Sequence, residues 1–277
     1  MKMKKAIQLK EITQNESTFI IEHEKKESIR LNKYISNSGY CTRKEADRLI
    51  ESGKVMIDGL PAKLGDQVFD NQSVIVNGNL IEVKHEHVYL ILNKPRGITC
   101  TGDPNIKDNI IDFMDYPETI FPVGRLDKDS SGLIILTNDG DIVNKILRST
   151  NGHEKEYIVH VDKYITDRFI QLMHKGVQIY NPVKNTYQMT KEAKITKIDD
   201  CTFRITITQG LNRQIRRMCK ALGYHVVTLE RVRIMNIELG SLRIGQWRYL
   251  RSNELFELNN LIKDSTSVYL DPEAIDE

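Results

Sequence analysis

Five runs of apolar and β-branched residues constrain this chain more strongly than any other feature of its sequence. They lie between residues 88 and 250 and read YLILNK, GLIILT, EYIVHVD, TFRITIT and HVVTLERVRI. Runs of this length and composition are typical of strands. Helical spacing of apolar residues appears between them, near residues 142–147, 166–174 and 212–222. The pattern predicts an α+β domain over residues 88–252, built on a large mixed, mainly antiparallel sheet.

Residues 29–84 are predicted to form a small separate domain in front of that sheet. Two short helices open it, and Thr42 and Glu45 have the spacing of a capping box at the start of the second. Asp-Gly and Asn-Gly pairs at residues 58–59 and 77–78 are strong signals for tight hairpins. So small a core contributes little stability, which indicates that this domain has a functional role and does not mainly stabilise the fold.

The two ends of the chain are predicted to lie outside these domains. Residues 1–28 form a polar extension with a β-like run at residues 17–21, and residues 253–277 form a helix and an acidic tail. The basic start lacks the apolar core of a secretory signal, and no apolar run reaches the roughly 18 residues of a membrane span. The sequence therefore predicts a cytoplasmic protein that does not enter a membrane, and we expect a monomer.

Charge is small overall but unevenly distributed. A formal net charge of +2 does not identify a nucleic-acid binder. Between residues 203 and 233, however, seven basic residues accompany one acidic residue, while the segment after residue 253 is acidic. A basic cleft of this kind suits a polyanion. A solvated charged surface without a partner is the alternative interpretation.

A polar loop, VGRLDKDSSG at residues 123–132, leads directly into an apolar strand. Loops fixed by a rigid strand are frequent positions for catalytic groups, which makes Asp127 and Asp129 candidates. An aspartate here is also a common turn or cap residue. Two carboxylates can form the acid–base pair of a glycosidase, although side chains two residues apart on an irregular loop need not converge.

A basic helix is predicted to start at Asn212. Its apolar residues share one face, and the opposite face carries its cations, Arg213, Arg216, Arg217 and Lys220. Cations beside a helix start suit phosphate contact. Arg216 lies at the edge nearest the apolar face, so it is best placed to reach a carboxylate inside the domain. An ordinary solvated helix face is the alternative.

Tyr157 is the aromatic candidate. The strand KEYIVHV places it on the same face as Val159 and Val161. Its ring can stack on a nucleobase, but packing in the core is the commoner role for such a tyrosine.

No metal site is expected, because the four cysteines form no C-x-x-C pair and the histidines lack ligand spacing.

Taken in order, these pieces resemble one protein family. LNKPRGITC, FPVGRLDKDSSGLIILTNDGD, HEKEYIV and QGLNRQIRRMCKALGY are similar to successive motifs of the bacterial ribosomal RNA pseudouridine synthases related to RsuA. The segment IRLNKYISNSGYCTRKEADRLIESGKVMIDG is similar to the αL RNA-binding domain that precedes their catalytic domain. The resemblance covers about residues 29–252, and LNRQIRRMC and RVRIMNIELG are most like the RluF branch, which acts on 23S rRNA. The N-terminal extension and the acidic tail do not match.

The resemblance implies which residues form the active site. Asp127 would be the essential carboxylate, Tyr157 would stack on the target uracil, and Arg216 would hold Asp127 in place. Arg125 and Lys94 would help to line the site. Further RNA contacts would come from cations of both domains, namely Arg30, Lys33, Arg43, Lys44, Arg48, Lys54, Arg213, Arg217 and Lys220.

The implied reaction is the isomerisation of one uridine in a 23S rRNA stem–loop, after the base has been extruded from the RNA fold. The glycosidic carbon–nitrogen bond breaks and uracil is rejoined through C5, so no cofactor or metal is expected. An ionised Asp127 would attack ribose or remove a ribose proton. The alternatives are a synthase of the same family for 16S rRNA or tRNA, a non-catalytic RNA-binding ribosome-assembly factor, and a sugar hydrolase built on Asp127 and Asp129.

Overall fold

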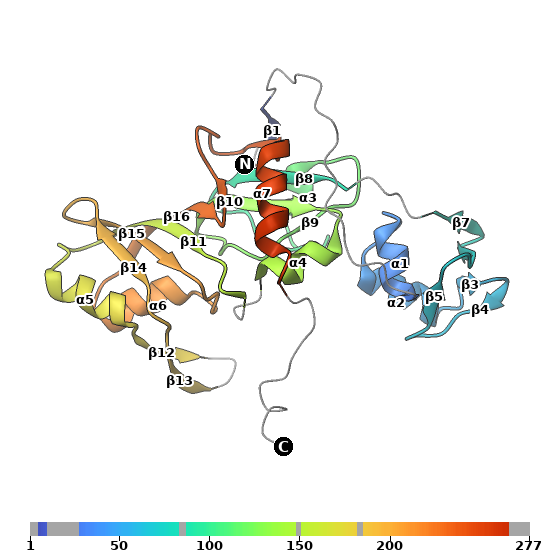
Figure 1. Cartoon of the computed structure of the whole chain (residues 1–277), viewed down its shortest axis with the longest axis horizontal. Helices are drawn as coiled ribbons and strands as arrows, with labels where there is room; N and C mark the ends of the chain where they lie inside the picture. The colour runs from blue at the N-terminus through green and yellow to red at the C-terminus, as the bar shows by residue number, and fades with distance from the viewer. Residues whose placement is uncertain (1–4, 10–27, 83–86, 148–150, 182–184, 266–277) are drawn as a thin grey trace.

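A ten-stranded sheet dominates the fold, and all of its strands except β1 lie after residue 88 (Figure 1). The computed structural model describes residues 5–9, 28–82, 87–147, 151–181 and 185–265. Across the sheet the order is β1, β18, β8, β10, β16, β11, β15 and β14, with β9 beside β10 and β17 beside β16. Only the β1–β18 and β10–β16 pairs are parallel, so the predicted α+β class with a mixed, mainly antiparallel sheet is confirmed.

The strands of this sheet are β1 (Ile7–Gln8), β8 (Tyr89–Lys94), β9 (Phe121–Pro122), β10 (Ser131–Thr137), β11 (Lys155–Val161), β14 (Lys194–Lys197), β15 (Thr202–Ile207), β16 (Val226–Ile234), β17 (Ile237–Glu238) and β18 (Gln246–Tyr249). The five predicted runs correspond to β8, β10, β11, β15 and β16. Strands shorter than five residues carry too little periodicity to stand out in a sequence.

Both faces of the sheet are buried at its centre. Alternate residues of β10, such as Leu133 and Ile134, belong to two different hydrophobic clusters, because successive side chains point to opposite faces. On one face the cluster is completed by α4 (Gly140–Leu147) and α7 (Ser252–Ile262). On the other it is completed by α3 (Ile110–Met114), α5 (Asp167–Lys175) and α6 (Gln214–Ala221). The strand β10 is therefore a rigid support for the loop that precedes it.

The front domain, residues 28–82, has its own small core. It contains β2 (Ser28–Arg30), α1 (Leu31–Asn37), α2 (Arg43–Glu51), β3 (Val55–Ile57), β4 (Leu60–Pro61), β5 (Gln67–Phe69), β6 (Val74–Val76) and β7 (Asn79–Ile81). Both hairpin pairs, at residues 58–59 and 77–78, have positive φ as a tight primed turn requires, so these turns are confirmed. The predicted capping box is confirmed only in its first half. The Thr42 side chain accepts a hydrogen bond from the Glu45 amide, but the Glu45 carboxylate pairs with Arg48 instead of the Thr42 amide.

The front domain contacts the large domain through its helices. Lys33 of α1 forms an ion pair with Asp141 of α4, 2.5 Å between Nζ and Oδ1. The Thr119 hydroxyl donates to the Gly39 carbonyl oxygen at 2.9 Å. A cavity of about 590 Å³ lies beside these contacts and is lined from both domains, with Arg43 on one side and Phe121 on the other.

The N-terminal extension contributes an edge strand to the large sheet. The Ile7 amide donates to the Gly245 carbonyl at 2.9 Å and the Leu9 amide to that of Trp247 at 2.7 Å. The front domain is therefore placed in the chain between two strands of one sheet. The β-like run predicted at residues 17–21 lies outside the described residues. Among the described helices, none is long and apolar enough to cross a membrane.

Candidate active site

The loop between β9 and β10 holds Asp127 in a fixed turn. The Ser130 amide donates to the Asp127 carbonyl at 3.0 Å, and the Gly97 amide donates to the Lys128 carbonyl at 2.6 Å. The Leu126 amide also contacts the Cys100 sulfur. With its backbone anchored in this way, Asp127 keeps 26% of its side chain exposed. The loop thus presents a carboxylate from the end of a buried strand, as the sequence predicts.

A cavity of about 820 Å³ opens beside this carboxylate and is called the Asp127 cavity below. Its lining comes from segments far apart in the sequence: residues 99–101, the loop at 124–130, β11, residues 210–215 and β16. Asp127, Arg125 and Tyr157 all line it. These three predicted site residues therefore meet in one place.

Arg213 is the cation nearest to Asp127. Its Nη1 lies 3.5 Å from Asp127 Oδ2, and its guanidinium also donates two hydrogen bonds to Asp129, at 2.9 and 3.0 Å. The Arg213 side chain therefore points at the Asp127 loop instead of away from the domain, and because it also lines the Asp127 cavity, its contact with RNA stays a prediction. Arg213 has a left-handed backbone at the N-cap, φ +49°, so α6 starts at Gln214 rather than at Asn212. Hydrogen bonds from Arg213 lower the pKa of Asp129.

Arg216 reaches inward, as predicted, but it mainly holds the loop. Its Nε is 3.9 Å from Asp127 Oδ2, which is a long ion pair. Its Nη2 donates to the Asp129 carbonyl at 3.0 Å and to the Ser130 hydroxyl at 3.1 Å, and its Nη1 to the Val226 carbonyl. With 11% of its side chain exposed, Arg216 ties the loop before β10 to the start of β16.

Tyr157 packs in the core and also lines the cavity, so its position is compatible with both roles considered from the sequence. Its ring belongs to the core cluster on one face of the sheet and is 8% exposed. The same side chain lines the Asp127 cavity. A ring fixed by packing on one side and open to a cavity on the other is preorganised to contact a flat ligand.

Two buried cations in the cavity were missed by sequence reasoning. Lys155 and Arg231 are 6% and 3% exposed, and both line the Asp127 cavity. Burial lowers the pKa of Lys155 to about 8. Alternation along β11 places Lys155 on the face of Tyr157, and that signal was available. Arg231 donates to the Leu133 carbonyl at 2.7 Å, but its buried Nη2 has no hydrogen-bond partner among the described residues.

Lys94 does not line the cavity, contrary to the prediction. Its side chain is fully buried, and its ammonium donates to the carbonyls of Pro95 and Ile98 at 2.8 and 3.0 Å. Burial lowers its pKa to about 8. Lys94 therefore fixes the segment that approaches the cavity from β8, because a buried ammonium needs such acceptors.

Other predicted RNA contacts lie outside this cavity. On α6, Lys220 is exposed, whereas Arg217 donates to the Tyr180 carbonyl and to the Asn212 side chain. In the front domain the predicted contacts Arg30, Arg43, Lys44, Arg48 and Lys54 are all exposed. Lys33 differs from them because Asp141 already neutralises it. Most of these charges are available to a polyanion.

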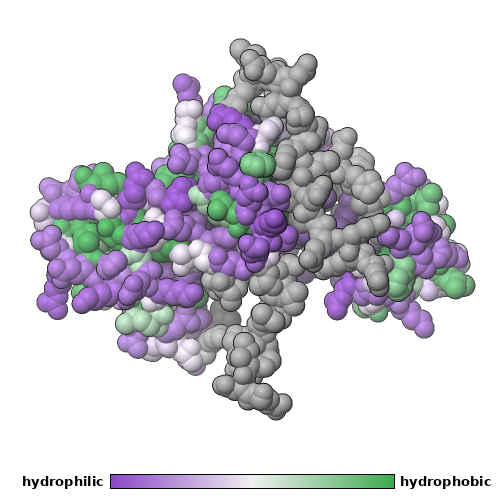
Figure 2. All heavy atoms as spheres, in the orientation of Figure 1, coloured by the Kyte–Doolittle hydropathy of each residue, from purple (hydrophilic) through white to green (hydrophobic). Residues whose placement is uncertain are grey.

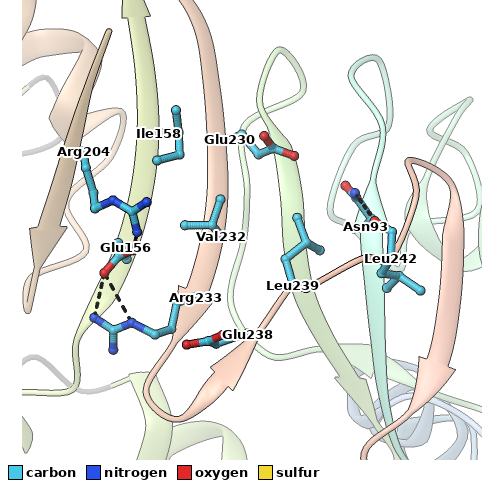
Figure 3. A pocket seen from close by; sticks show the side chains of 11 residues that line it. Asn93, Glu156, Ile158, Arg204, Glu230, Val232, Arg233, Glu238, Leu239 and Leu242 are labelled. Carbon is cyan, nitrogen blue, oxygen red and sulfur yellow. Dashed lines mark hydrogen bonds and ion pairs between the residues drawn. The ribbon is translucent and has the colours of Figure 1, made fainter. Parts of the chain in front are cut away.

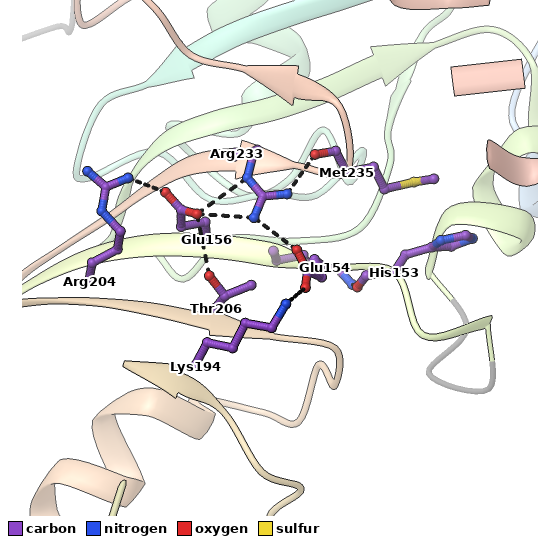
Figure 4. A network of polar contacts seen from close by, with 9 residues as sticks. His153, Glu154, Glu156, Lys194, Arg204, Thr206, Arg233 and Met235 are labelled. Carbon is purple, nitrogen blue, oxygen red and sulfur yellow. Dashed lines mark hydrogen bonds and ion pairs between the residues drawn. The ribbon is translucent and has the colours of Figure 1, made fainter. Parts of the chain in front are cut away.

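A second polar cavity, of about 330 Å³, lies on the opposite face of β11 (Figure 3). Glu156 there accepts from Arg204, Arg233 and Thr206 (Figure 4). Hydrogen bonds from Lys194 and Arg233 lower the pKa of Glu154. These two carboxylates are engaged by several donors each, and no aromatic ring is among the described residues that line the cavity. The Asp127 cavity is therefore the better candidate for an active site.

The residues of the Asp127 cavity give no indication of a metal. Among the described residues, no group of three or more His, Cys, Asp or Glu side chains is arranged to bind one. The donors present are instead cations next to two aspartates, a pattern that suits an anionic ligand and an ionised carboxylate.

Comparisons with known proteins agree with this geometry. An RNA pseudouridylate synthase family matches residues 88–221, and the S4 domain family matches residues 29–74. The dual-specificity RNA pseudouridine synthase RluF of Salmonella typhi is 54% identical over 242 residues, which cover 87% of this chain and 82% of the relative. The ribosomal large subunit pseudouridine synthase B of Bacillus subtilis is 34% identical, covering 84% of this chain and 96% of that protein.

A solved structure has the same fold. A crystal structure of a pseudouridylate synthase aligns with a TM-score of 0.60 at 32% sequence identity, covering 83% of this chain and 99% of that one.

Proposed function

The chain belongs to the RNA pseudouridine synthases, in the RluF-type group that carries an S4 domain, and we propose that it isomerises a specific uridine of 23S rRNA. Membership in this family makes the chain an isomerase, so the non-catalytic alternative is wrong. The finer parts of the proposal are the RNA substrate and the roles of individual residues.

The observation that carries the proposal is the convergence at the Asp127 cavity. A half-buried carboxylate lies beside two guanidiniums, and a tyrosine ring lines the same space. The groups come from the loop before β10, from β11 and from α6. A volume of about 820 Å³ is within the range typical of ligand pockets, and it accommodates one extruded nucleoside.

In the proposed reaction Asp127 acts on the ribose of that nucleoside. As a nucleophile it attacks C1′, and as a base it removes a ribose proton; either role requires the ionised form. The bond from C1′ to N1 breaks, the uracil turns against Tyr157, and C1′ bonds to C5. In the nucleophilic route the bond between Asp127 and C1′ breaks as C5 attaches, and in the base route Asp127 returns the proton to the ribose. The proton lost from C5 is balanced by one gained at N1, so the product is an isomer of the substrate.

Contacts between the RNA and the cations around the cavity would offset the free-energy cost of extruding the base, which is a few kcal/mol in a folded RNA. Arg125 and Lys155 line the cavity, and the unpartnered Nη2 of Arg231 is a buried donor in need of an acceptor. A phosphate or a uracil carbonyl of the RNA supplies one. The exposed cations of the S4 domain provide the second, more distant part of the RNA contact.

The target is tested by incubating the protein separately with protein-free 23S rRNA, 16S rRNA and bulk tRNA. Pseudouridine is then mapped at nucleotide resolution in each RNA. We expect modification of 23S rRNA at a discrete position. If only 16S rRNA is modified, or only tRNA, the assignment of the substrate is wrong although the enzyme class stands.

A second substrate is a specific alternative because the RluF relatives are called dual-specificity enzymes. We propose tRNA as the second RNA to examine. Discrete modification of both 23S rRNA and tRNA would extend the proposed function and leave the role of Asp127 unchanged.

A further inference from the structure

A small hairpin next to α6 exposes two neighbouring aromatic rings, which are tilted against each other. It consists of β12 (Gln178–Asn181) and β13 (Thr186–Met189), and Tyr180 pairs directly opposite Tyr187. The ring centroids are 5.5 Å apart with an interplanar angle of 59°. Figure 1 shows this hairpin at the lower left, projecting away from the large sheet.

The two faces of the hairpin differ sharply in how far their side chains are exposed to solvent. Ile179 points inward and is 3% exposed. The outward face carries Tyr180, Tyr187 and Met189, which are 43%, 70% and 65% exposed, together with the exposed Gln178 opposite Met189. In Figure 2 white and pale green spheres interrupt the purple hydrophilic surface at this corner of the molecule.

A purely structural role does not account for this outward face. A cross-strand aromatic pair stabilises a hairpin by up to about 1 kcal/mol. The Tyr180 hydroxyl does fasten the hairpin by donating to Asn185 Oδ1. Together with Ile179 and the hydrogen bond between Asn181 and Gln188 it already anchors the hairpin, so the exposed ring of Tyr187 is not needed for that purpose. Large apolar side chains left this exposed next to one another are more typical of a binding surface than of a hairpin fastening.

The hairpin is continuous with the candidate active site. Arg217 donates to the Tyr180 carbonyl at 3.2 Å and to Asn212 Oδ1 at 2.5 Å. Asn212 in turn lines the Asp127 cavity. The helix between them, α6, has no acidic residue and carries Arg216, Arg217 and Lys220. A polyanion that enters the cavity is therefore attracted along α6 towards the hairpin.

We propose that the outward face of the hairpin binds an unpaired base of the substrate RNA, which stacks on Tyr187 while a neighbouring nucleoside occupies the Asp127 cavity. The inference rests on the proposed function, because it takes RNA as the ligand. Every nucleobase has a flat face that stacks on an aromatic ring, whereas a continuous duplex offers only phosphates and sugars to a projecting hairpin. The contact would favour RNA with unpaired nucleotides close to the target uridine.

The test compares two double and two single variants in a binding assay with in vitro transcribed 23S rRNA. Tyr180→Leu with Tyr187→Leu keeps apolar side chains but removes the rings, while Tyr180→Phe with Tyr187→Phe keeps the rings. Tyr164→Leu is the matched control, since Tyr164 is 59% exposed and its ring contacts Lys197 instead of this hairpin. Tyr187→Leu alone guards against misfolding of the hairpin.

We expect the leucine pair to raise the Kd for the RNA by roughly fivefold to a hundredfold, the range for loss of one base stack. The phenylalanine pair and the Tyr164 control should bind within about twofold of the wild type. Because no charge is removed, the slope of log Kd against log salt should stay parallel to that of the wild type.

Three outcomes would overturn the inference: unchanged binding by the leucine pair, equal weakening by the phenylalanine pair, or a changed salt slope. A leucine pair that loses a protein partner but binds RNA normally would also overturn it. Failure of the proposed function is distinguishable, because it would appear as absent 23S rRNA modification by the wild type, whatever the hairpin variants do.

Discussion

Replacing Asp127 by asparagine is expected to lower pseudouridine formation by at least about a thousandfold while leaving RNA binding within about twofold. Asparagine keeps the size of the side chain but carries no negative charge, so it can neither attack ribose nor accept a ribose proton. The turn should survive, because its bonds come from the backbone of the loop. The rate is measured under single-turnover conditions with saturating RNA.

Asp129→Asn is the matched control for this substitution. Asp129 is two residues away and is held by two hydrogen bonds from Arg213, so its carboxylate is already engaged. We expect its loss to reduce the rate by no more than about tenfold, by loosening Arg213. If Asp129→Asn were the inactive variant and Asp127→Asn the active one, the assignment of the carboxylate would be reversed.

Gly132→Ala is expected to lower the free energy of unfolding by about 2–4 kcal/mol. Gly132 has φ +106°, and an added Cβ would lie 2.3 Å from the Arg231 carbonyl oxygen and 2.6 Å from its amide nitrogen. This is backbone, which cannot rotate away as a side chain can. The parallel contact between β10 and β16 would have to open, and with it the anchor of the Asp127 loop.

Gly210→Ala separates this clash from the general cost of replacing a glycine near the site. Nothing lies within 4 Å of a Cβ at Gly210, and its φ is not in the left-handed region. Denaturant unfolding should give a change of less than about 0.5 kcal/mol for this control. Equal stability of the two variants would show that β10 and β16 are not as close as described.

The main features of the fold were predictable because they depend on periodicity along single segments. The buried strand β10 after the GRLD loop is one, and the alternation that places Tyr157 inward on β11 is another. The apolar face of α6, with Ile215, Met218 and Cys219, is a third. In each case the local pattern and the tertiary environment agree.

What was not predictable depends on contacts between distant segments. Arg213 points at the loop because its backbone is left-handed, which helix periodicity does not reveal. Lys94 is buried because the carbonyls of the following segment fold back over its ammonium. The strand β1 forms only by pairing with β18, more than 200 residues later. The ion-pair partner of Lys33, Asp141, lies in the other domain, so this contact also depends on segments that are distant in the sequence.

In the proposed reaction an extruded uridine lies between Asp127 and Tyr157. The most direct measurement is a crystal structure of the Asp127→Asn variant in complex with a 23S rRNA stem–loop that the wild type modifies. We predict one flipped nucleoside in the Asp127 cavity, with its base against the Tyr157 ring and its ribose next to the substituted side chain. A flipped nucleoside in the cavity between the domains or in the Glu156 cavity would contradict the claim.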